Sequence, residues 1–85
     1  MNVYADRALE IVRQYVVDQL DKTDPIPEFE VYVVWFCKTL QNWKTLVGTS
    51  LPDLKYYEVT YNGDRGQVYL DVYLKVYNTC YVGST

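Results

Sequence analysis

The chain has 85 residues and a formal net charge of −3; 49% of its residues are hydrophobic and 22% are charged. A domain of this size buries only about 60–65% of the surface that its unfolded chain exposes, which leaves no room for a large internal pocket. The apolar content excludes a disordered chain, and the longest apolar run, 31–37, is too short to span a membrane. Histidine is absent, and with it the commonest general base and metal ligand. We therefore expect one domain over residues 1–85 that binds or assembles and is not an enzyme.

Residues 3–21 are expected to form an amphipathic helix. Asn2 is a suitable N-cap, and the helix must end before Pro25 and Pro27, because proline breaks the hydrogen-bond ladder. The apolar stripe of this helix recurs at spacings of three and four and consists of Ala5, Ala8, Leu9, Val12, Tyr15, Val16 and Leu20.

After the prolines the apolar period changes from 3.6 to 2, which indicates strands rich in β-branched and aromatic residues. The clearest turn signal is the Asn62-Gly63 pair, since hairpin turns require positive φ angles. Four strands are expected, at about 28–38, 43–49, 55–61 and 67–81.

The last expected strand alternates without a break. Its Val-Tyr pairs also recur every four residues, as on a helix face, but the valine and tyrosine content favours a strand. At roughly 3.3 Å per residue it would span close to 50 Å. It must therefore bend, bulge or continue into a neighbouring subunit. One of its faces is valine- and leucine-rich, and the other carries Tyr69, Asp71, Tyr73, Lys75, Tyr77, Thr79 and Tyr81.

These elements predict an α+β fold, in which the N-terminal helix packs on one face of a four-stranded, mostly antiparallel sheet. The valine and leucine face of the last strand is the expected contact for the helix. The tyrosine face is then left uncovered. It fits three interpretations: a solvent-exposed sheet surface, a subunit interface, or a ligand face where rings stack on a planar base.

The tryptophans and cysteines carry separate expectations. Trp35, between Val34 and Phe36, is expected in the core. Trp43, beside Lys44, is expected to be partly exposed, where it would either grip a nucleobase and its phosphate or cap the sheet edge. Both cysteines are expected to be small buried hydrophobes, with a disulfide between them as the alternative.

The sequence offers few residues for nucleic-acid binding, catalysis or metal binding. The eight basic residues are outnumbered by eleven acidic ones, which argues against duplex nucleic acid as a partner. Glu28 and Glu30 are expected at an exposed strand start, and Asp64 and Asp71 lack partners for catalysis or metal binding. We expect no cofactor and no metal. The N-terminal residues do not resemble a signal peptide, so an intracellular protein without a membrane partner is expected.

Three segments resemble a family of small uncharacterised proteins encoded by phages and prophages of Gram-positive bacteria. They are 31–47 (VYVVWFCKTLQNWKTLV), 56–64 (YYEVTYNGD) and 69–73 (YLDVY), and the similarity extends over most of residues 1–77. The resemblance implies a short accessory phage protein that acts in the host cytoplasm. By analogy of setting, it is similar to phage anti-defence proteins, compact oligomers that hold nucleotide immune signals in pockets between subunits.

The resulting functional prediction is a homo-oligomeric protein that sequesters a small nucleotide-type ligand without consuming it. The alternative is an inhibitor or adaptor that uses the aromatic face against a host protein. A hydrolase of signalling nucleotides is a third, weaker interpretation, because it would need a metal held by carboxylates alone. The residues expected to bind the ligand are Trp43, Lys44, Tyr57, Tyr61, Arg65, Tyr73 and Lys75.

Overall fold

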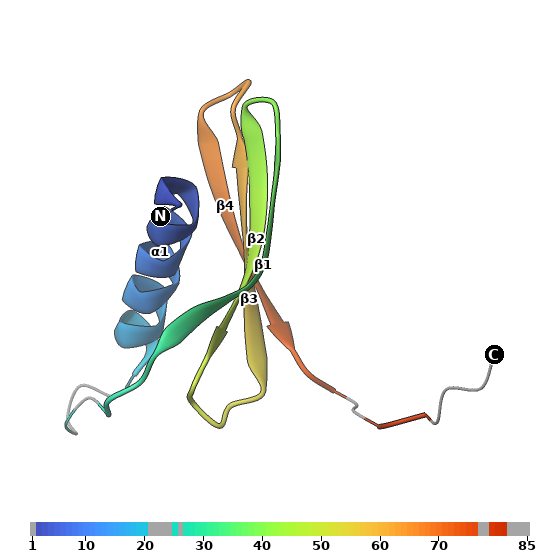
Figure 1. Ribbon diagram of the computed structural model, residues 1–85. Coiled ribbons are helices and arrows are strands. Elements are labelled where there is room, and N and C mark those ends of the chain that lie inside the picture. Colours follow the sequence, from blue (N-terminus) through green and yellow to red (C-terminus); the bar gives the residue numbers. More distant parts are fainter. Residues whose placement is uncertain (1, 21–24, 26, 77–78, 82–85) are drawn as a thin grey trace.

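The computed structural model describes residues 2–20, 25, 27–76 and 79–81 of the chain. One N-terminal helix packs against a four-stranded antiparallel open sheet, which confirms the α+β fold (Figure 1). The strands follow one another as a meander in the order β1-β2-β3-β4. Their bounds are Val31–Thr39, Asn42–Thr49, Lys55–Asn62 and Gln67–Leu74.

Helix α1 spans Val3–Gln19, close to the expected range. Its N-terminus is capped by Asn2, whose Oδ1 accepts from the backbone N–H groups of Tyr4 and Ala5 at 3.0 and 3.2 Å. At the other end, Leu20 adopts an extended conformation and terminates the helix; Asp21 lies outside the described residues. The residues that α1 buries share one stripe at spacings of three and four: Ala5, Ala8, Val12 and Val16.

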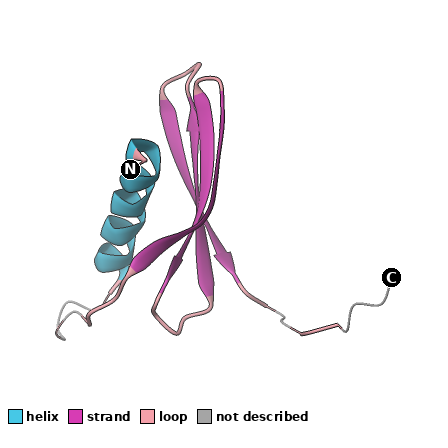
Figure 2. Cartoon of the chain, in the orientation of Figure 1, coloured by secondary structure: helices cyan, strands magenta, loops and turns pink. Residues whose placement is uncertain are grey.

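The core lies between α1 and the central strands. From β2, Trp43 and Val47 are 4% and 0% exposed, and from β3, Tyr57 and Val59 are 2% and 0% exposed. The segment before β1 closes one end of this core with Phe29, whose ring lies 5.1 Å below the guanidinium carbon of Arg13. Figure 2 shows the helix along one side of the twisted strands, with no described helix or strand covering the other side.

A β-bulge in β1 decides which side chains face the helix. The β1–β2 register shifts between Val33 and Trp35, so one extra residue is inserted and the alternation of faces is reversed beyond it. Phe36 therefore joins the core, and Trp35, expected there, is 41% exposed on the opposite side. The expected exposure of Trp43 is also wrong: Trp43 shares the helix side of β2 with Thr45 and Val47, and its ring stacks on that of Tyr61 at 5.6 Å.

The same bulge places Cys37 on the exposed side, and Cys80 is exposed too. Both thiols are free. The expectation that they are buried hydrophobes is therefore wrong, and no disulfide joins them.

The last strand is shorter than the sequence pattern indicates. β4 ends at Leu74, where β3 begins opposite it at Lys55. One further backbone bond, from the Lys75 N–H to the Leu54 carbonyl at 2.6 Å, closes the ladder. Leu54 has a φ of 59° and turns the chain away, so nothing in this sheet can pair with the continuation. Residues 75–76 and 79–81 are not in a strand, and Tyr77 lies outside the described residues.

The contact between α1 and the sheet also differs from expectation. The helix packs mainly on β1, β2 and β3. Val68 and Leu70 of β4 reach the margin of the core, but Val72, Leu74 and Val76 are 40%, 62% and 87% exposed. The valine and leucine face of the last strand is therefore only partly covered.

The tips of the two hairpins contact each other. The Gly63 N–H donates to Asn42 Oδ1 at 2.8 Å, and the Gln41 side chain donates to the Asp64 carboxylate. A Cβ on Gly63 would lie 2.3 Å from the Gln41 carbonyl oxygen, so this approach requires glycine.

The bulge makes a prediction about the two tryptophans. In the Trp35→Phe protein, the remaining Trp43 should emit at short wavelength and resist acrylamide quenching. In the Trp43→Phe protein, Trp35 should be readily quenched. We expect Trp43→Phe to cost about 1–3 kcal/mol of unfolding free energy in urea titrations, and Trp35→Phe about 0.5 kcal/mol or less. Equal quenching of the two indoles would contradict the register shift.

The buried phenol of Tyr57 predicts alkaline sensitivity. Burial raises the pKa of Tyr57 above its ordinary value of 10.0, and the Asp53 carboxylate and Tyr15 raise it further. Above pH 10 the unfolded chain therefore loses this proton more readily than the folded one, and the free energy of unfolding falls as the pH rises. Denaturant titrations between pH 9 and 11 should show a smaller fall for Tyr57→Phe. An identical slope in both proteins would rule out this origin.

Candidate ligand-binding face

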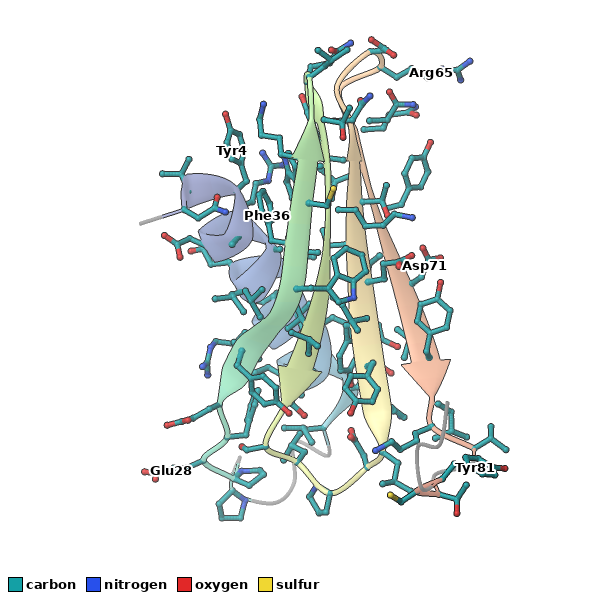
Figure 3. The ribbon with its side chains drawn as sticks, turned by 45° about the vertical axis from the view of Figure 1, so that its right-hand side comes forward. Tyr4, Glu28, Phe36, Arg65, Asp71 and Tyr81 are labelled. Atoms are coloured by element: carbon teal, nitrogen blue, oxygen red, sulfur yellow. The ribbon has the colours of Figure 1, made fainter. Side chains whose placement is uncertain are left out.

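The side of the sheet opposite α1 is exposed, and we call it the open face. Figure 3 looks onto it, with the helix behind the strands. Tyr32, Trp35, Tyr69 and Tyr73 are each between 41% and 50% exposed there. Strand register and alternation assign to this face Tyr32, Trp35, Cys37, Thr39, Asn42, Lys44, Leu46, Gly48, Tyr56, Glu58, Thr60, Asn62, Gln67, Tyr69, Asp71 and Tyr73.

One end of the open face holds a small concave site, the Lys75 pocket. Its volume is about 130 Å³, and its lining includes Tyr32, Leu54, Tyr56 and Lys75. The Lys75 Nζ lies 5.7 Å from the centroid of the Tyr56 ring. The pocket thus combines two aromatic rings with an ammonium group; its volume is below the roughly 300–1,000 Å³ of small-molecule sites, so a nucleotide held there would also extend over the open face.

Gly48 fixes one wall of this pocket. It is paired with Tyr32 across the β1–β2 ladder, and a Cβ on Gly48 would lie 2.7 Å from atoms of the Tyr32 ring. The absence of a side chain therefore lets the Tyr32 ring lie close over the backbone of Gly48. Aromatic side chains cover strand glycines in this way, and the contact holds the ring in place.

A second depression, the Trp35 hollow, lies nearer the hairpin tips. It has a volume of about 320 Å³, and its lining includes Trp35, Cys37, Lys44 and Thr60. The buried Thr45 donates its hydroxyl to the Trp35 carbonyl at 2.8 Å, which satisfies that carbonyl within the bulge. The bulge thus presents a half-exposed indole beside a lysine.

Between the two concave sites lies a group of charged and phenolic side chains centred on Glu58. Its Oε1 is 3.5 Å from the Lys44 Nζ and accepts from the Tyr73 hydroxyl at 3.3 Å. The Glu58 carboxylate raises the pKa of Tyr73, with smaller contributions from burial and from Asp71. Tyr73 is therefore a neutral phenol that donates to Glu58 at neutral pH. Lys44 is partly neutralised by the same carboxylate.

The structure separates the residues that the sequence analysis grouped as ligand-binding. Lys44, Tyr73 and Lys75 contribute to the open face or its pockets. Trp43 and Tyr57 are buried under the helix, and Tyr61 stacks on Trp43; Trp43 and Tyr61 also line the Trp35 hollow, but none of the three rings lines the Lys75 pocket.

Arg65 is exposed in the turn between β3 and β4, at the far end of the sheet from the Lys75 pocket (Figure 3). Ten residues separate it from Lys75, most of them in the extended strand β4, which corresponds to a distance of about 30 Å. The two cations are too far apart to hold the phosphates of one mononucleotide.

Sequence reasoning missed three aromatic residues of the open face: Tyr32, Trp35 and Tyr56. For Tyr56 the signal was present, because Tyr57 is on the core side and neighbouring strand residues face opposite ways. Trp35 could be placed only by knowing the bulge. The position of Tyr32 depends on its partner Gly48, which is set by the hairpin register.

The chemistry available on the open face is stacking, hydrogen bonding and a limited positive charge. Within the described ranges, no group of three His, Cys, Asp or Glu side chains could hold a metal ion. Among the described residues there is also no helix with the length and apolarity needed to cross a membrane.

The fold and this face define the molecule as a small α+β protein with one side of its sheet uncovered. By comparison of sequence, residues 5–83 match the family of unknown function DUF6275, and the chain belongs to that family. Comparisons with curated proteins and with solved structures gave no match.

The group around Glu58 gives a testable prediction. Replacing Glu58 by Gln removes the largest cause of the raised pKa of Tyr73, so this pKa should fall towards its ordinary value of 10.0. NMR titration of protein with ¹³C-labelled tyrosine rings measures it directly. Glu10→Gln, on the exposed side of α1, removes the same charge at a distance and should leave Tyr73 unchanged. A Tyr73 pKa that does not respond to Glu58→Gln would contradict the contact.

Proposed function

We propose that this protein is a non-catalytic, homo-oligomeric binding protein that sequesters a nucleotide-type ligand at its open face. The Lys75 pocket is the observation that carries the proposal. Its two rings offer stacking surfaces, worth on the order of 1–3 kcal/mol per base in single-stranded nucleic acid complexes. Its ammonium group offers charge-assisted hydrogen bonds to a phosphate. A base and a phosphate are the two parts of a nucleotide.

The setting of this activity is part of the proposal. The resemblance to phage and prophage proteins suggests an anti-defence role in the host cytoplasm, where capture of an immune signal such as a cyclic dinucleotide or an ADP-ribose derivative would silence it. Sequestration needs affinity without turnover. A sequestering site therefore needs only stacking and ionic contacts with its ligand, and the described residues of the open face offer both.

A second candidate, an inhibitor or adaptor that binds a host protein, is favoured by the Trp35 hollow. A half-exposed indole beside Tyr and Lys side chains is typical of protein interfaces, where Trp and Tyr are enriched. The net negative charge of the protein would suit a basic target protein. Pull-down from a host lysate separates the candidates, because a nucleotide sponge retains no stoichiometric protein partner.

The ligand proposal is tested by thermal shift against a panel of cyclic dinucleotides, ADP-ribose and mononucleotides. A ligand present at 100 times its Kd adds about 2.7 kcal/mol, which for a domain of this size raises Tm by about 10 °C or more. Tyr56→Leu and Lys75→Gln should each weaken binding roughly tenfold or more, because they remove the stacking surface and the cation.

Arg65→Gln is the matched control. It also removes one positive charge, but about 30 Å from the pocket, and should leave binding of a mononucleotide unchanged. The proposal fails if no member of the panel stabilises the protein at high micromolar concentration. It fails equally if Tyr56→Leu binds as well as the natural chain.

A further inference from the structure

We infer that β4 is the subunit interface: two copies pair their β4 strands antiparallel, edge to edge, around a two-fold axis at Tyr73, and so join two sheets into one. This inference deepens the homo-oligomeric part of the proposed function and rests on it. It does not depend on the identity of the ligand.

The two edge strands of the sheet, β1 and β4, differ in how readily they could pair with a strand of another chain. β1 is interrupted by the bulge at Val33 and Trp35, a feature that protects an edge strand from pairing with another chain. β4 pairs with β3 without any shift of register, contains no proline and is apolar along one face. In the described part of the chain, β4 has a neighbouring strand only on its β3 side. An edge of this kind is a template for strand addition.

The hydrogen-bond pattern shows which backbone groups this edge offers. The bond from the Lys75 N–H to the Leu54 carbonyl marks Lys75 as a residue whose backbone groups point to β3. Because antiparallel ladders alternate, the odd-numbered residues of β4 share that direction. The residues that direct their N–H and C=O outward are therefore Val68, Leu70, Val72 and Leu74.

This parity limits the registers in which two β4 strands can pair. A residue whose backbone groups point away from β3 must pair with another such residue in the second copy. These residues have even numbers, so the numbers of any two paired residues add to an even sum. With the axis at Tyr73, Val72 exchanges hydrogen bonds with Leu74 of the second copy. On the open face, Asp71 then lies opposite Lys75 of the second copy, and the reverse, in the pairs where side chains come closest.

Charge selects this register from its neighbours. An axis at Asp71 or at Lys75 would place two like charges directly opposite each other, which destabilises a sheet. An axis at Val72 or at Leu74 also satisfies the parity but pairs no opposite charges, whereas an axis at Tyr73 gives two attractive pairs. Asp71 also needs such a partner, because within its own chain it lies opposite Glu58, another carboxylate. The ammonium of Lys75 has three N–H donors and can serve Asp71 of the second copy and a ligand phosphate together.

The apolar residues that α1 leaves bare support the same arrangement. Val72 and Leu74 are 40% and 62% exposed on the helix side of β4. In the paired sheet Val72 lies opposite Leu74 of the second copy, and the reverse, so the two exposed apolar margins cover each other. Figure 1 shows the chain leaving the sheet directly after β4, so no further strand of the described chain occupies this edge.

The test is a charge exchange followed by sedimentation. The natural chain should sediment at twice its 10.0 kDa mass at micromolar concentration. Asp71→Lys and Lys75→Asp each turn both attractive pairs into repulsive ones and should weaken the dimer roughly tenfold or more. The double variant, Asp71→Lys with Lys75→Asp, restores opposite charges and should recover the dimer.

Matched controls are Glu10→Lys and Arg7→Asp, which make the same charge changes on the exposed side of α1 and should leave the dimer intact. Circular dichroism confirms that each variant is folded. A monomer at several hundred micromolar overturns the inference, and so does a dimer that ignores the single exchanges or is not rescued by the double one. The nucleotide panel applied to the natural chain and to Asp71→Lys, which both keep Tyr56 and Lys75, separates failure of this inference from failure of the proposed function: nucleotide binding can persist in either protein whether or not it dimerises.

Discussion

A single helix can cover only part of a four-stranded sheet, and most features of this protein follow from that limit. Strands are spaced about 4.8 Å apart and a helix is about 10–12 Å across, so one helix spans two or three strands on one face. Here α1 lies over β1, β2 and β3 and buries Trp43, Val47, Tyr57 and Val59. The opposite face and the margin at β4 remain exposed to solvent within the chain, and both candidate functions depend on one or the other.

The sequence predicted the helix, the existence of all four strands and an uncovered tyrosine face on β4, because periodicity and turn residues report on local backbone preference. It could not predict the bulge. A single inserted residue leaves the composition of β1 unchanged but exchanges the faces of Trp35–Thr39, which moves Trp35 to the open face and Phe36 to the core side. Nor could alternation alone end β4 at Leu74, since that end is set by Leu54 on the neighbouring strand connection.

The candidate site shows the same division between local and non-local information. Lys75 and Tyr73 were identified from the pattern of their own strand. The Lys75 pocket, however, needs Tyr32 from β1 and Tyr56 from β3, which are brought together only by the register of the meander and by the lack of a side chain at Gly48. Trp43 and Tyr57 were assigned to ligand binding because aromatic rings serve cores and binding sites equally well; burial, which decides between the two, depends on the helix.

The meander order also has a kinetic consequence. Every pair of neighbouring strands is consecutive in the chain, so each ladder closes a short loop, and contacts of this kind allow fast folding. During synthesis, β1 to β3 can form beneath α1 as soon as they emerge, whereas β4 is the last strand of the sheet to be made. In chain order, its outer edge is therefore the last part of the sheet that can form, after the core beneath α1 is in place.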